Sequence, residues 1–144
     1  MPVKRPKHLL IVGGGVFQVP AIKIAKSMGL KVVVTDYNPE AEGMLLADYP
    51  IEVSTRNINL TVNTAKQFHR ACPLDGVLTV GTDASQTVAA VADALNLPGI
   101  PFEVAERATD KIKMRQVLQE KGVLVPEFRP IWTLEDCRQA INDM

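Results

Sequence analysis

The stretch that decides the fold is residues 8–36, which read HLLIVGGGVFQVPAIKIAKSMGLKVVVTD. Residues 8–12 and 31–35 are short apolar runs rich in branched residues, which is typical of strands buried on both faces. Between them, apolar residues recur at helical spacing over residues 16–28, and Gly29 follows as a C-terminal cap. A strand, a crossover helix and a second strand predict the first unit of a parallel sheet.

The same alternation continues to about residue 101. The sequence predicts a short helix, a third strand, a long helix, a fourth strand and an Ala/Val-rich helix, in that order, at residues 39–47, 51–54, 59–71, 76–80 and 84–95. Strands that alternate with helices over short links predict an α/β fold with helices on both faces of the sheet. We therefore expect residues 1–101 to form a Rossmann-like, doubly wound parallel sheet.

The pattern changes after Pro101. A further helix is predicted at residues 110–121, where Thr109 can serve as the N-cap and Gly122 lies just beyond the end. This helix has no strand before it, so it does not continue the alternation of the preceding domain.

The last residues complete only a small part of a second module. Residues 123–132 (VLVPEFRPIW) are extended, and the TLED of residues 133–136 resembles a capping box that opens a helix at about residues 134–144. A helix, a short strand and a helix do not make a domain. We therefore expect residues 102–144 to begin an incomplete second module, and the chain to be a fragment.

Composition places the chain among ordinary globular domains. The 144 residues carry 16 basic and 16 acidic side chains, so no net charge would attract nucleic acid. The apolar fraction is 47%, but no apolar run approaches the roughly 20 residues that a membrane helix needs. The two cysteines lack a metal-binding spacing and are expected to be free thiols in a reducing compartment. These features favour a cytoplasmic protein.

A glycine-rich turn follows the first strand, at the sheet edge where ligands bind in open parallel sheets. Gly13, Gly14 and Gly15 let the backbone approach a ligand closely, and the helix that follows suits a phosphate or carboxylate. Gly13 and Gly15 also match the first two glycines of G-x-G-x-x-G, but Gln18 occupies the third position. Asp36 lies where a dinucleotide domain keeps its ribose acid. A ligand site, a nicotinamide-cofactor site and a ligand-free turn are therefore all possible.

Polar residues follow the fourth strand at the same edge, in residues 81–85 (GTDAS). Thr82 and Asp83 could contact a ligand, with Asp83 accepting hydroxyl or ammonium hydrogens. The alternative is that a side chain of this segment only caps the following helix. Arg56 and Asn57 follow the third strand and could also reach this edge.

Three stretches together resemble ATP-grasp ligases. Residues 9–55 and 75–99 resemble the two halves of the N-terminal domain that precedes the ATP-grasp module. Residues 108–128 (ATDKIKMRQVLQEKGVLVPEF) resemble the entry to that module. The type occurs in biotin carboxylase, in the carbamoyl phosphate synthetase large chain and in purine-pathway carboxylate–amine ligases. The most specific feature is the combination of GGG after the first strand with the later DK and KGVLVPEF.

The resemblance implies a parent ligase that uses ATP and Mg²⁺ to activate a carboxylate as an acyl phosphate, which an amine or similar nucleophile then attacks. Lys111, in the DK position beside a helix N-terminus, would help to bind ATP. The substrate-binding edge, facing a small-molecule carboxylate, would carry Gly13, Gly14, Gly15, Asp36, Thr82 and Asp83. A homodimer is also possible.

The family's later parts have no counterpart in these residues. They are a strand lysine, a glycine-rich lid, and acidic and Asn magnesium ligands. Because phosphoryl transfer depends on such parts, we expect the fragment itself to be inactive and to hold neither ATP nor Mg²⁺ tightly. No catalytic or metal-ligating residue is assigned within it.

Two alternatives remain open at this point. One is an NAD(P)-binding Rossmann domain of an oxidoreductase, which would use Asp36. The other is a short non-enzymatic protein that docks a partner through its last helix, because an amphipathic helix without a neighbour needs burial.

Overall fold

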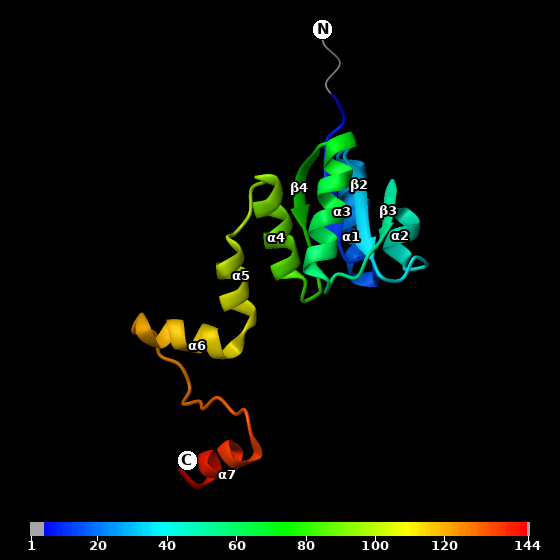
Figure 1. Cartoon of the computed structure of the whole chain (residues 1–144). Helices are drawn as coiled ribbons and strands as arrows, with labels where there is room; N and C mark the ends of the chain where they lie inside the picture. The colour runs from blue at the N-terminus through cyan, green and yellow to red at the C-terminus, as the bar shows by residue number, and fades with distance from the viewer. Residues whose placement is uncertain (1–4, 144) are drawn as a thin grey trace. The chain divides into compact units, whose positions relative to one another are not determined.

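The computed structural model describes residues 5–143 (Figure 1). The chain divides into two compact units, the first ending at Thr109 and the second beginning at Asp110. The first unit holds β1 (His8–Val12), the 3-10 helix η1 (Val16–Gln18), α1 (Val19–Ser27), β2 (Lys31–Asp36), α2 (Glu42–Leu46), β3 (Tyr49–Glu52), α3 (Ile58–Ala71), β4 (Leu74–Leu78), α4 (Ser85–Leu95) and α5 (Phe102–Thr109). The second holds α6 (Lys111–Glu120) and α7 (Leu134–Asp143).

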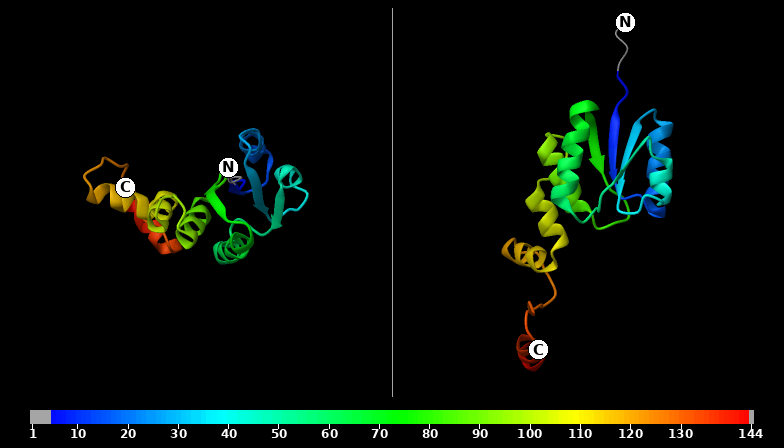
Figure 2. Two further views of the ribbon diagram at one scale, coloured as in Figure 1. Left: turned by 90° about the horizontal axis from the view of Figure 1, so that it is seen from above. Right: turned by 45° about the vertical axis from the view of Figure 1, so that its right-hand side comes forward.

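The first unit is built on a four-stranded sheet in the order β3-β2-β1-β4, with every neighbouring pair parallel. Helices cover both faces, as the two views of Figure 2 show. The predicted α/β fold with a doubly wound parallel sheet is confirmed. The parallel pairing brings the carboxyl ends of all four strands to one edge, which is the edge where the sequence places its glycine loop.

Each face of the sheet has its own apolar core. On one face, Leu10 and Val33 pack with residues of α3 and α4 such as Ala65 and Val91. On the other face, Ile11, Val32 and Val34 pack with Ile22 of α1 and Met44 of α2. Because successive residues of β1 and β2 face opposite cores, both strands are apolar without alternation.

One helix of the first unit was not predicted. Residues 102–109 form α5, whose Ala105 is fully buried. The Asp93 side chain of α4 accepts a hydrogen bond from Phe102 N–H at 3.1 Å, which ties the start of α5 to α4. The helix is only eight residues long, too short for periodicity to reveal it. The predicted division into a substrate-side domain of residues 1–101 and the start of a second module at residue 102 stays a prediction.

Asp110, not Thr109, caps α6. The Asp110 carboxylate accepts hydrogen bonds from Ile112 N–H at 2.9 Å and Lys113 N–H at 3.1 Å. The Thr109 hydroxyl instead donates to Ala105 O and accepts from the Gln86 amide, so it closes α5. The prediction of Thr109 as the cap was wrong because α5 extends to this residue.

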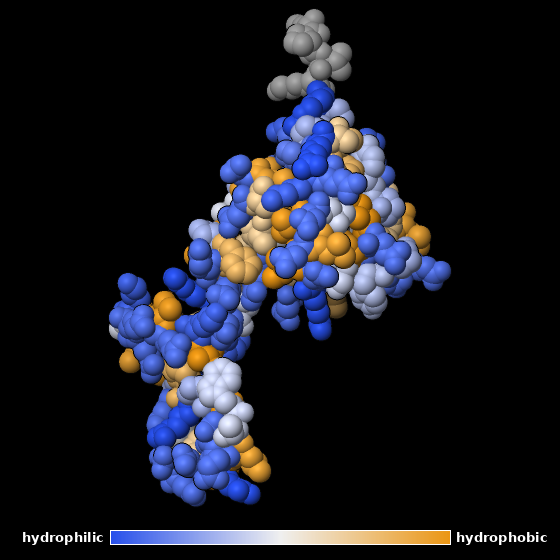
Figure 3. Space-filling model, in the orientation of Figure 1, coloured by the Kyte–Doolittle hydropathy of each residue, from blue (hydrophilic) through white to orange (hydrophobic). Residues whose placement is uncertain are grey.

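The second unit contains the predicted capping box. Thr133 N–H donates to Asp136 Oδ2 at 2.8 Å, and Asp136 N–H donates to Thr133 Oγ1 at 3.1 Å. Residues 123–132 form no strand, although a short strand was predicted, because no other segment among the described residues pairs with them. Apolar side chains appear among charged ones on the surface of this unit (Figure 3). Trp132, Leu134 and Ile141 are each more than two thirds exposed.

Both cysteines, Cys72 and Cys137, are free, as predicted. Within residues 5–143, no helix has the length and apolar character needed to cross a membrane.

Because α2 packs closely on the glycine loop, we expect a substitution of Gly43 to lower the stability of the protein. Its N–H donates to Gly14 O at 2.6 Å, and an added Cβ would lie 2.7 Å from both Gly14 O and Ile22 Cδ1. Gly43→Ala should therefore destabilise the protein by about 1–3 kcal/mol, although alanine favours helix. The measurement is the urea unfolding midpoint. Gly76→Ala is the control, since its Cβ would meet only Leu9 Cδ1 at 3.4 Å, and an equal loss in both variants would contradict the packing argument.

Asp75 joins the N-terminal segment to β4 and predicts a pH dependence. Arg5 donates to both carboxylate oxygens at 2.7 and 2.8 Å, and His8 N–H donates at 2.9 Å. Chiefly through the Arg5 hydrogen bond, and against the effect of burial, these contacts lower the pKa of Asp75.

Because the pKa of Asp75 is lower in the folded state, its ionised carboxylate stabilises the fold at pH values above its pKa in the unfolded chain, which is about 4. This stabilisation is lost as the pH falls through the pKa of Asp75 in the folded state. At pH 7, Asp75→Asn should cost about 1 kcal/mol or less, because the pair is partly solvated. Urea unfolding should show the difference between the two proteins narrowing below about pH 4. A constant difference from pH 7 to pH 3 would rule out this role.

Candidate functional site

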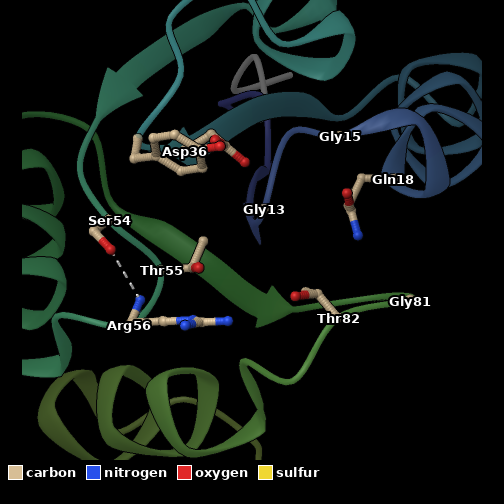
Figure 4. Close-up of a pocket in the computed structure, with 10 residues that line it drawn as sticks. Gly13, Gly15, Gln18, Asp36, Ser54, Thr55, Arg56, Gly81 and Thr82 are labelled. Carbon is tan, nitrogen blue, oxygen red and sulfur yellow. Dashed lines mark hydrogen bonds between the residues drawn. The ribbon is translucent and has the colours of Figure 1, made fainter.

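A cavity of about 590 Å³ lies at the carboxyl-end edge of the sheet, within the first unit. Its walls come from the glycine loop, the end of β2 and the loops that follow β3 and β4 (Figure 4). The lining residues are Gly13, Gly15, Gln18, Asp36, Tyr37, Ser54, Thr55, Arg56, Gly81 and Thr82. The structure thus brings Gly13, Gly15, Asp36 and Thr82 together, as the sequence predicted for this edge.

Gly14 belongs to the framework of the loop rather than to the cavity wall. Its N–H donates to Asp36 Oδ2 at 2.8 Å and its carbonyl accepts from Gly43 N–H at 2.6 Å. An added Cβ would lie 2.9 Å from Met44 Cγ. Gly14 therefore packs toward the core, and both its N–H and its carbonyl group form hydrogen bonds within the fold. Gly13, whose φ of +103° favours glycine, and Gly15 face the cavity.

Asp36 holds the loop by both carboxylate oxygens. Besides Gly14 N–H on Oδ2, Asn38 N–H donates to Oδ1 at 3.0 Å. The side chain therefore joins the turn after β1 to the turn after β2 while it lines the cavity. This is a structural use that its position at the end of a strand did not reveal.

Gln18 is a lining residue that the sequence argument treated only as the place of a missing glycine. The residue is 4% exposed, and its side-chain amide donates to Val80 O. The contact ties the glycine loop to the segment after β4. Sequence reasoning missed it because the partner is a backbone carbonyl distant in the chain.

The segment of residues 54–56 forms the opposite wall. Two buried hydroxyls hold it from below: Thr61 Oγ1 of α3 donates to Ser54 O at 3.2 Å, and Thr87 Oγ1 of α4 donates to Thr55 O at 2.6 Å. Asn57 caps α3 by accepting from Leu60 N–H at 3.1 Å, so its side chain is committed to the helix. Arg56 follows these anchors and lines the cavity.

The segment after β4 contributes Thr82 but not Asp83. Thr82 lines the cavity, whereas Asp83 is exposed and absent from the lining. Neither caps α4, because the N-cap position is Ala84 and no side chain bonds the free N–H groups there. The predicted capping by this segment was therefore wrong.

Lys111 lies in the second unit, as the exposed first residue of α6. The N-terminus of this helix is not free for a phosphate, because the Asp110 carboxylate occupies the N–H groups of Ile112 and Lys113. The expectation of a free helix end beside Lys111 was wrong, and its ammonium group is what remains for a ligand.

The described part of the chain contains no cluster of three or more His, Cys, Asp or Glu side chains that could hold a metal ion. The cavity itself is lined by one carboxylate, one guanidinium and the hydroxyls of Tyr37, Ser54, Thr55 and Thr82. Such a set suits binding and orientation of a polar ligand.

This combination of a four-stranded parallel sheet and a glycine-lined cavity has known relatives. The family model of the ATP-grasp N-terminal domain matches residues 22–99, which is more than half of the chain. The chain belongs to this family.

Solved structures of ligases share the fold. An L-amino acid ligase from Bacillus licheniformis is 29% identical with a TM-score of 0.74, over 93% of this chain and 35% of its own. A phosphoribosylglycinamide synthetase from Anaerococcus prevotii is 25% identical with a TM-score of 0.74, over 97% of this chain and 35% of its own.

An N5-carboxyaminoimidazole synthetase from Staphylococcus aureus, complexed with ADP, shows the same fold at 20% identity, with a TM-score of 0.75 over 97% of this chain and 36% of its own. The chain thus spans about a third of the length of these ligases. No protein in the curated set matches by sequence.

The two acids predicted at the site give a matched test. Asp36→Ala removes the acceptor of two backbone N–H groups and should cost about 1–3 kcal/mol of unfolding free energy. Asp83→Ala should change it by less than about 0.5 kcal/mol, because the residue is exposed. Amide NMR should also show a large shift at Gly14 only in the Asp36 variant. Equal stability of the two variants would contradict the structural role of Asp36.

Proposed function

We propose that this chain is the substrate-side N-terminal domain, with the first elements of the nucleotide lobe, of an ATP-grasp ligase. The ligase joins a carboxylate to an amine or similar nucleophile through an acyl phosphate, using ATP and Mg²⁺. The observation that carries the proposal is the glycine-lined cavity at the carboxyl-end edge of the sheet, in a chain that belongs to the ATP-grasp N-terminal family.

On this proposal the small-molecule carboxylate substrate enters the cavity. Gly13 and Gly15 allow its close approach to the backbone, and Thr82 offers a hydroxyl from the facing segment. Gly14 and Asp36 act mainly by holding the loop in place. Asp83 would contribute only to a ligand that extends beyond the cavity wall.

The nucleotide would be served by Lys111. The residue is exposed and carries a flexible ammonium group, which suits a phosphate. On this proposal the Mg²⁺ ligands come from other parts of the ligase. The 144 residues are not expected to catalyse the reaction alone, because charge neutralisation around the phosphates requires those parts.

The dinucleotide alternative has less support. A ribose is bound by a carboxylate that accepts its hydroxyl hydrogens, and Asp36 already accepts one backbone N–H group on each oxygen, so fewer acceptor positions are left for a ribose. In addition, Gln18 occupies the place of the third glycine, and its side chain lines the cavity and donates to Val80 O. The glycine motif of a dinucleotide site is therefore incomplete.

The partner-docking alternative rests on the exposed apolar side chains of the second unit, Trp132, Leu134 and Ile141. Burial of the same side chains is equally expected if the nucleotide lobe continues after α7. They therefore do not favour docking over the ligase.

The test uses the native ligase, whose intact mass should exceed about twice the 15.7 kDa of this chain. In it, Lys111→Ala should weaken ATP binding about 10- to 100-fold, as expected for a lost charged hydrogen bond. Isothermal titration measures the affinity. Lys121→Ala is the control, because it removes the same charge at the other end of α6. Unchanged ATP affinity in the Lys111 variant would remove this residue from the nucleotide site.

A further inference from the structure

The cavity contains a positive charge that the fold does not use. Among the described residues, none forms a hydrogen bond or ion pair with the Arg56 guanidinium, and the one hydrogen bond of the residue runs from its backbone N–H to Ser54 Oγ at 3.3 Å. Arg5 and Arg129 differ from it, since they form ion pairs with Asp75 and Asp143. Arg56 is thus available to a ligand.

Two buried threonines fix the backbone on which Arg56 stands. Thr61 and Thr87 are 0% and 2% exposed, and their hydroxyls bind the consecutive carbonyls of Ser54 and Thr55. Because these anchors come from α3 and α4, the position of the segment depends on packing of both helices against the sheet. A flexible loop would not need two buried hydroxyls directed at adjacent carbonyls.

The surroundings of the guanidinium are rich in donors. Figure 4 shows the Arg56 side chain extending along the cavity toward Thr82, with Thr55 beside it. Across the cavity, no described residue accepts a hydrogen bond from Gly15 N–H. The single carboxylate, Asp36, accepts one backbone N–H group on each oxygen, from Gly14 and from Asn38. A ligand therefore meets N–H and O–H donors together with the Arg56 guanidinium, while the charges of Asp36 and Arg56 sum to zero over the lining.

We propose that Arg56 docks an oxyanion of the ligand, a phosphate ester or a carboxylate, between its guanidinium and the hydroxyls of Thr55 and Thr82. Thr61 and Thr87 are positioning residues that act through the backbone of Ser54 and Thr55. A planar guanidinium suits either oxyanion by paired hydrogen bonds. This inference deepens the proposed function, since the oxyanion belongs to the ligase substrate.

The test is an amide NMR titration of the 144-residue chain with inorganic phosphate and, separately, with succinate. Either anion should shift the amides of residues 54–56 and 82 with a saturable dependence. Arg56→Gln should weaken binding at least tenfold. Arg70→Gln, which removes the same charge near the far end of α3, about 20 Å away, should leave it unchanged. Tighter binding of phosphate would identify a phosphate ester, and tighter binding of succinate a carboxylate.

The positioning residues are tested with Thr87→Val and Thr87→Ser. The valine variant loses the hydroxyl and should weaken anion binding several-fold, with shifted Thr55 and Arg56 amides. The serine variant keeps the hydroxyl and should bind within about twofold of the wild type. A loss of thermal stability in Thr87→Val without any change in anion affinity would show that Thr87 only stabilises the fold.

Absence of a saturable response to both anions, or equal weakening in Arg56→Gln and Arg70→Gln, would overturn the inference. The proposed ligase function has a separate measurement, ATP binding in the Lys111 variant. If the wild-type chain binds neither anion while ATP binding of the ligase depends on Lys111, only the role of Arg56 is rejected.

Discussion

The Asp36 carboxylate connects the turns after β1 and β2 by accepting Gly14 N–H on one oxygen and Asn38 N–H on the other. Gly14 in turn accepts Gly43 N–H from α2. The glycine loop, the end of β2 and the start of α2 therefore form one hydrogen-bonded assembly. Because a Cβ at Gly14 or Gly43 would lie within 3 Å of neighbouring atoms, a side chain at either position would displace the loop that lines the cavity.

The other walls of the cavity are held in a similar way. Gln18 ties the loop to Val80, and threonines of α3 and α4 hold the segment that carries Arg56. Most buried polar groups near the cavity thus serve to position backbone, as expected where a site must be rigid. Arg56 is the charged side chain that this framework leaves without a partner.

Membership of the ATP-grasp N-terminal family sets this cavity in a known context. The chain matches 35% of the length of each of two ligases that it resembles. Under the proposed function, a phosphate at the start of α6 meets the Lys111 ammonium rather than the helix end, because Asp110 caps this helix.

Patterns within one element were readable from the sequence. The continuous apolar runs of β1 and β2, the helical spacing of α1 and the TLED box all predicted the elements that formed, because period and capping are local properties. The edge of the sheet where the ligand residues would gather followed from parallel pairing alone. Gly13, Gly15, Asp36 and Thr82 line the cavity for that reason.

What each residue does at that edge was decided only by the tertiary structure. Asp36 accepts the Gly14 N–H group, and Gly14 itself packs against Met44 of α2. Gln18 donates to Val80 O, whereas Asp83 is exposed. These partners of Asp36, Gly14 and Gln18 lie at least 22 residues away in the sequence. The backbone that carries Arg56 is held because the Thr61 and Thr87 hydroxyls donate to the carbonyls of Ser54 and Thr55. Such contacts depend on how the chain folds back on itself, and no local spacing of residue types encodes them.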